Sequence, residues 1–87
     1  MGFIVYKYEN NVYSINMEKI VGVDLIVDED KKIAKIEIET HDSILTILLQ
    51  DKIHMAEKIY YKILDVIVRY KDTKSVINLN KIIQSFF

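Results

Sequence analysis

The 87-residue sequence contains no cysteine, no proline and no tryptophan, and it has only two glycines, Gly2 and Gly22. A domain of this size has a thin hydrophobic core, and small secreted domains often gain the missing stability from disulfides. Without cysteine, this chain has no disulfides. Two isolated glycines cannot build the glycine-rich loop that cradles a phosphate group. The sequence is instead 51% hydrophobic and rich in isoleucine, which is typical of a globular domain and not of a disordered chain.

Neither sign of charge predominates, because 12 basic residues nearly balance 13 acidic ones and the net charge is −1. This total favours neither nucleic acid nor an anionic membrane as a partner. No apolar run approaches the roughly 18 residues that cross a bilayer, and the first residues lack the charged region and long apolar stretch of a signal peptide. We therefore expect a cytoplasmic protein without a membrane partner. The abundant Lys, Ile, Asn and Tyr have AT-rich codons, which indicates a low-GC genome, such as that of a bacterium or phage.

Catalytic and metal-binding patterns are weak. His41 and His54 are the only histidines, and no clustered Cys/His spacing accompanies them. Glu37 and Glu39 lie two residues apart on a predicted strand, where a solvated face is a simpler interpretation than paired acid/base catalysis. The acidic run 28–30 lacks the spacing and glycine of a calcium loop, and no serine lies in a nucleophile elbow. We predict no enzyme, no cofactor and no metal.

Strand patterns fill the first half of the chain. Residues 33–40 alternate cleanly between apolar and charged side chains, which predicts a strand with Ala34, Ile36 and Ile38 facing inward. Similar β-branched and aromatic segments, separated by turn residues, predict an antiparallel sheet of about five strands: 3–8, 12–15, 20–27, 33–40 and 44–49.

A long helix is predicted over residues 51–70, with Asp51 as its N-cap. The last segment is ambiguous. Leu79 and the apolar residues after it repeat at helical spacing, which favours a short helix over 79–87. However, residues 77–83 also echo residues 15–21, which lead into a strand. The whole chain, 1–87, is expected to form one α+β domain.

The long helix carries more apolar surface than one sheet needs. Its apolar arc covers well over half of the circumference, whereas a helix on an open sheet needs only about 100°. Met55 and Val66 widen the arc on one side, and Tyr61 and Val68 widen it on the other. Either the chain's own end or a second copy must cover the surplus. The candidate interface residues are Met55, Tyr61, Val66, Val68, Ile82, Ile83, Phe86 and Phe87.

Two functional hypotheses follow. The first is a non-catalytic interaction or assembly module that self-associates, most simply as a homodimer, or else binds another protein. The face of the predicted sheet away from the long helix supports this hypothesis, because it is only partly polar. Among its charged residues lie apolar Ile20, Ile26, Ile44 and Leu48. The alternative is a nucleic-acid-binding accessory protein. Its contacts would be Lys58, Tyr61, Lys62 and Arg69 on the polar side of the long helix.

Overall fold

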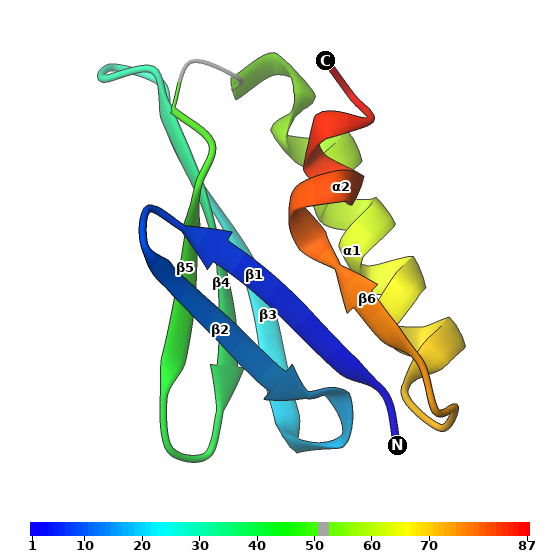
Figure 1. Ribbon diagram of the computed structural model, residues 1–87. Coiled ribbons are helices and arrows are strands. Elements are labelled where there is room, and N and C mark those ends of the chain that lie inside the picture. The colour runs from blue at the N-terminus through cyan, green and yellow to red at the C-terminus, as the bar shows by residue number, and fades with distance from the viewer. Residues whose placement is uncertain (51–52) are drawn as a thin grey trace.

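The computed structural model describes residues 1–50 and 53–87, and these form an α+β fold (Figure 1). The predicted fold class is confirmed, but the strands form two three-stranded sheets where the sequence indicated one. A long helix and a short C-terminal helix lie beside the sheets. The predicted N-cap, Asp51, lies outside the described residues.

The first sheet has the order β2-β1-β6. Strand β1 (Phe3–Tyr8) pairs antiparallel with β2 (Asn11–Asn16) and parallel with β6 (Val76–Asn78). Glu9, and not one of the asparagines that follow it, takes the left-handed backbone of the hairpin turn, with φ 55°. The sheet therefore brings an N-terminal strand and a segment near the C-terminus side by side.

The second sheet has the order β3-β4-β5 and is antiparallel throughout. It consists of β3 (Ile20–Asp28), β4 (Ile33–Thr40) and β5 (Ile44–Leu48). A single 3₁₀ turn, η1 (Met17–Lys19), separates it from β2. The Asn16 side chain caps this turn by accepting from the Glu18 N–H at 3.0 Å, and the Met17 side chain is buried. This capped turn redirects the chain, so β3 begins a new sheet.

The long helix begins with a 3₁₀ turn, η2 (Ile53–Met55), and continues as α1 (Ala56–Tyr70). After a polar connector, the ambiguous last segment is both strand and helix: β6 is followed at once by α2 (Leu79–Gln84). The Asn78 side chain makes this change possible by capping the Asn80 and Lys81 N–H groups. Helix α2 ends at Gln84 and not at Phe87, because the last N–H groups bond three residues back, as in a turn.

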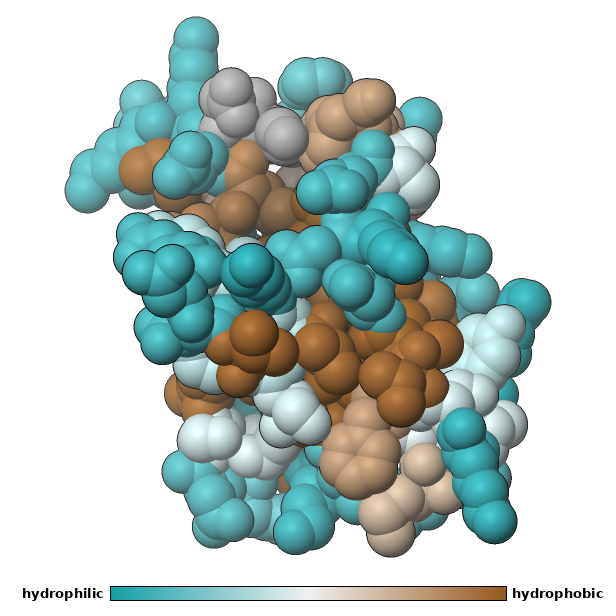
Figure 2. All heavy atoms as spheres, viewed as in Figure 1, coloured by the Kyte–Doolittle hydropathy of each residue, from teal (hydrophilic) through white to brown (hydrophobic). Residues whose placement is uncertain are grey.

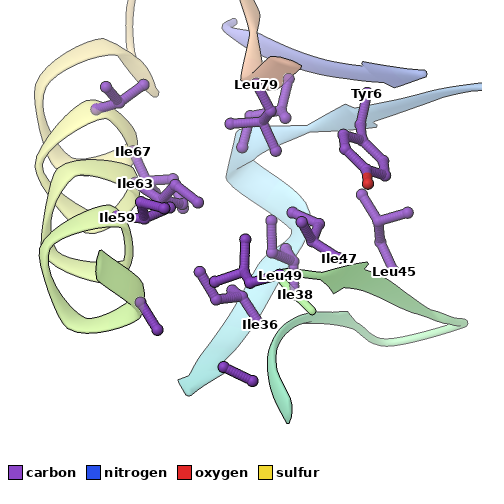
Figure 3. Packing of buried hydrophobic residues seen from close by; sticks show 14 of the residues in the cluster. Tyr6, Ile36, Ile38, Leu45, Ile47, Leu49, Ile59, Ile63, Ile67 and Leu79 are labelled. Carbon is purple, nitrogen blue, oxygen red and sulfur yellow. The ribbon is translucent and has the colours of Figure 1, made fainter. Parts of the chain in front are cut away.

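The core lies between the two sheets and α1. Figure 3 shows Ile59, Ile63 and Ile67 pointing from α1 toward the second sheet, with Leu79 of α2 and Tyr6 of β1 above them. The inward residues of β4 are fully buried, as the alternation predicted: Ala34, Ile36 and Ile38. Each large apolar side chain buried in this way contributes about 1.5–3 kcal/mol.

Candidate interaction surface

One side of α1 is covered by the chain itself. Val66 is only 4% exposed, and Ile82, Ile83 and Phe86 are partly buried against the core. Helix α2 lies along α1 in this region (Figure 1). Met55, at the start of the helix, is also partly buried. The C-terminal segment therefore satisfies one of the two surplus sides that the sequence indicated.

The other side of α1 stays exposed. Tyr61 is 59% exposed and Val68 is 76% exposed, and Leu64 lies between them, half-buried. These three residues are spaced three and four apart, so they share one face of the helix. The Tyr61 ring packs edge-on against Tyr60 with the centroids 5.5 Å apart. We call Tyr61, Leu64 and Val68 the exposed flank. Phe87, another candidate interface residue, is also exposed.

Strand β3 is an outer strand of the second sheet, and its hydrogen-bonding pattern shows which groups face outward. The Leu49 N–H donates to the Ala34 carbonyl at 2.9 Å, so Ala34 directs its backbone groups toward β5. In an antiparallel ladder, a β3 residue opposite a β4 residue of this kind makes no hydrogen bond to it, because the backbone groups of both residues point away from each other. Val23, Leu25 and Val27 oppose Ile38, Ile36 and Ala34. Their N–H and C=O groups therefore point away from β4.

Only one of these outward groups has a partner among the described residues. The Tyr60 hydroxyl donates to the Val23 carbonyl oxygen at 3.0 Å. No other hydrogen bond from residues 1–50 and 53–87 reaches the outward groups of Leu25 or Val27. We call the outward backbone of Val23, Leu25 and Val27 the β3 edge. An open strand edge of this kind is a template for pairing with another strand.

The exposed flank and the β3 edge lie on the same side of the molecule. Tyr60 contacts β3 and directly precedes Tyr61 in the helix. Near the other end of β3, Leu25 and Val27 line a shallow hollow together with Glu57 of the first helical turn. Helix α1 therefore runs back along β3, antiparallel to it. Apolar side chains on this side of β3 are also exposed, namely Val21, next to a register shift, and Val27.

The outer faces of both sheets carry smaller apolar groups. On the second sheet, Ile26, Ile33, Ile44 and Leu48 are exposed, but Lys35 and Glu37 lie among them as an ion pair of 3.7 Å. On the first sheet, Val12 and Val76 are exposed and Phe3 and Val5 are half-buried. Figure 2 shows hydrophobic atoms gathered over β1 and β6, bordered by polar ones. Both groups are interrupted by polar side chains.

The basic residues proposed for nucleic-acid contact share one exposed side of α1. Lys58, Lys62 and Arg69 lie there, with Tyr61 at its border. Asp65 lies in their midst and contacts Lys62 at 3.9 Å and Arg69 at 3.3 Å. Exposed ion pairs of this kind contribute little stability, but the carboxylate offsets part of the positive charge that would attract a phosphate backbone.

Polar residues elsewhere do not gather. Among the described residues, no three His, Cys, Asp or Glu side chains are placed to hold a metal ion. His41 lies in the turn before β5, and His54 lies in η2, both exposed. Within the same part of the chain, no helix is long and apolar enough to cross a bilayer.

Burial and, secondarily, the nearby Tyr8 raise the pKa of the Tyr6 hydroxyl, which belongs to the core and not to a polar cleft.

Comparison with known proteins supplies no family: no family model, curated protein or solved structure matches this chain. The functional assignment therefore depends on the geometry of the exposed flank and the β3 edge. The sequence indicated the flank through helical periodicity. It gave no signal for the edge, because the apolar pattern of 20–27 does not say which strand of a sheet lies outermost.

Proposed function

We propose that this chain is a non-catalytic interaction module that self-associates through the exposed flank of α1. The observation that carries the proposal is the uncovered pair Tyr61 and Val68, which remain 59% and 76% exposed although α2 has packed against the same helix. Burying such side chains gains about 1.5–3 kcal/mol each, a large amount against a total stability of roughly 5–15 kcal/mol.

A second copy is a suitable occupant on electrostatic grounds. The net charge of −1 opposes association only weakly. When two copies of α1 pack antiparallel across a two-fold axis, the two helix dipoles oppose each other favourably.

Charged substitutions on the exposed flank test this function. We expect Val68→Lys and Tyr61→Lys each to raise the dimer dissociation constant by about tenfold or more, because a charge must then be buried in an apolar contact. Lys58→Gln is the matched control, since it changes an exposed residue on the polar side of the same helix, and it should leave the dissociation constant nearly unchanged. Sedimentation equilibrium measures all three. Flank variants that dimerise as tightly as the wild type would contradict the proposal.

The nucleic-acid alternative and the cytoplasmic location stay predictions. Binding through Lys58, Lys62 and Arg69 would weaken steeply as salt is raised, because counterions are released from the phosphates. A titration with labelled single- and double-stranded probes at low salt tests it, and a flat titration ends it. Fractionation of the producing cells tests the location.

A further inference from the structure

We propose that the second copy docks on the β3 edge, so that β3 of one protomer pairs antiparallel with β3 of the other and the two second sheets become one continuous sheet. This inference rests on the proposed self-association and names the surface that the two copies share. It differs from the contact of the exposed flank, because it is made by the backbone.

The backbone groups of the β3 edge are complementary to themselves. Val23, Leu25 and Val27 each direct an N–H and a C=O away from β4, and these positions are two residues apart. An antiparallel partner needs outward groups at this same spacing. A two-fold axis perpendicular to the sheet presents them from an identical strand, which makes the interface isologous. Strand addition to an open edge is an established mode of recognition.

Charge selects among the possible registers. Asp24 and Asp28 are the acidic residues of β3. Registers that place Asp24 opposite Asp24 or opposite Asp28 of the other copy bring like charges together, which destabilises a strand pair. The two neighbouring registers avoid this contact. One places Leu25 opposite Leu25, with Asp24 opposite Ile26, and the other places Val23 opposite Val23, with Asp24 opposite Gly22. Both use the Leu25 N–H.

The same operation brings the two helices together. Helix α1 lies beside β3 through the Tyr60–Val23 hydrogen bond, with its exposed flank on the side of the open edge. When the edges pair, the two α1 helices therefore lie on the same face of the joined sheet, antiparallel, with their exposed flanks directed toward each other. One two-fold axis thus engages the unpaired backbone and the uncovered helix surface together. For this reason a second copy fits the site better than a single extended peptide.

Amide hydrogen exchange tests the pairing without any substitution. In the monomer, the Leu25 and Val27 N–H groups have no partner among the described residues, so they exchange fast. We expect protection of the Leu25 N–H, which both registers use, to rise by about tenfold or more when the protein concentration is raised from well below to well above the dimer dissociation constant. Protection of the Val27 N–H rises as well only in the register that places Leu25 opposite Leu25. A dimer that leaves the Leu25 amide fast overturns the edge pairing and leaves self-association standing. A wild-type protein that is monomeric throughout overturns both.

A matched pair of variants tests the same point independently. Leu25→Pro removes the outward N–H, which bonds to nothing in β4, and proline is tolerated at such an edge position. Leu25→Ala removes the same side-chain packing and keeps the N–H. We expect Leu25→Pro to weaken the dimer about tenfold more than Leu25→Ala does, by sedimentation equilibrium. Circular dichroism checks that both variants fold, and if Leu25→Pro does not, the concentration dependence of Leu25 N–H exchange in the wild-type protein decides the point. Equal dissociation constants for the proline and alanine variants overturn the pairing.

Discussion

The Tyr60 hydroxyl donates a hydrogen bond of 3.0 Å to the carbonyl oxygen of Val23. This contact joins the long helix, which is packed on the sheet through its buried residues, to the outer strand, and it marks the exposed flank as lying beside the open edge. Because it occupies only the Val23 carbonyl, the Leu25 and Val27 backbone remains available. The position of Tyr60 therefore links the packing of the monomer to the surface proposed for the dimer.

Tyr60→Phe separates these two roles. Loss of a part-buried hydrogen bond is expected to lower the free energy of unfolding by about 0.5–1.5 kcal/mol, measured by urea denaturation. Dimerisation should not weaken, because the hydroxyl bonds within the protomer and the outward backbone groups of β3 are unchanged. A variant with wild-type stability but a weaker dimer would show that the hydroxyl acts in the interface and not within the protomer.

Asn80 joins the C-terminal segment to the first sheet. Its side-chain amide accepts from the Lys7 N–H and donates to the Lys7 carbonyl, each at 2.8 Å, so it continues the β6 pairing where the backbone has turned into α2. We expect Asn80→Ala to destabilise the fold by about 1–3 kcal/mol. Asn80→Asp keeps an acceptor for the Lys7 N–H but places a carboxylate oxygen against the Lys7 carbonyl oxygen, so it should not restore the stability lost in the alanine variant in thermal denaturation. Equal stability of all three would contradict this role.

The two glycines are expected to differ in their tolerance of alanine. A Cβ at Gly2 would collide with the Tyr70 carbonyl oxygen, and the Gly2 backbone is held by bonds to Lys71 and Met17. Gly2→Ala should therefore cost about 1–3 kcal/mol of stability, as overpacking does. Gly22→Ala is the control, because its Cβ would meet only a Glu39 side-chain oxygen at 3.8 Å, an ordinary contact. Urea denaturation of both variants measures the two losses of stability. A larger loss for Gly22→Ala than for Gly2→Ala would contradict this account.

The buried Tyr6 hydroxyl is expected to make the free energy of unfolding fall in alkali. Its pKa is raised above the ordinary value of 10.0 by burial and then by Tyr8. The unfolded chain therefore releases this proton at a lower pH than the folded protein does, and the unfolded state is favoured as the pH rises. The stability contribution is complete below about pH 10 and is lost as the pH passes through the folded-state pKa. Tyr6→Phe should remove this part of the decline, as followed by denaturation at stepwise increasing pH.

Local patterns predicted the individual elements well. The alternation of 33–40 identified Ala34, Ile36 and Ile38 as inward residues, and all three are 0% exposed. Helical spacing gave α1 and its buried stripe, because both depend on residues only three or four positions apart. The division into two sheets was not predictable in this way. It depends on the capped turn Met17–Lys19, which keeps β2 and β3 apart, and on the long-range pairing of Phe3 with Val76, which no local pattern records.

The candidate surface was predictable only in part. The surplus of apolar residues around α1 is covered on one side by the C-terminal segment, and the other side stays exposed. Which side would be covered depended on the path of α2, and that path is set by the Asn78 cap and the Asn80–Lys7 contact. Val66 became buried as a result, whereas Tyr61 and Val68 did not. Long-range contacts of this kind decide which side of the helix is buried and which stays exposed, and the local pattern of a single sequence does not reveal them.

The most direct measurement is the mass of the wild-type protein in solution across a range of concentrations. Sedimentation velocity and equilibrium, from submicromolar to submillimolar protein, follow the species as a function of dilution. We expect the mass to approach twice 10.3 kDa at the upper end and to fall toward the monomer on dilution. A single 10.3 kDa species at every concentration would contradict self-association, and with it the pairing of the β3 edges.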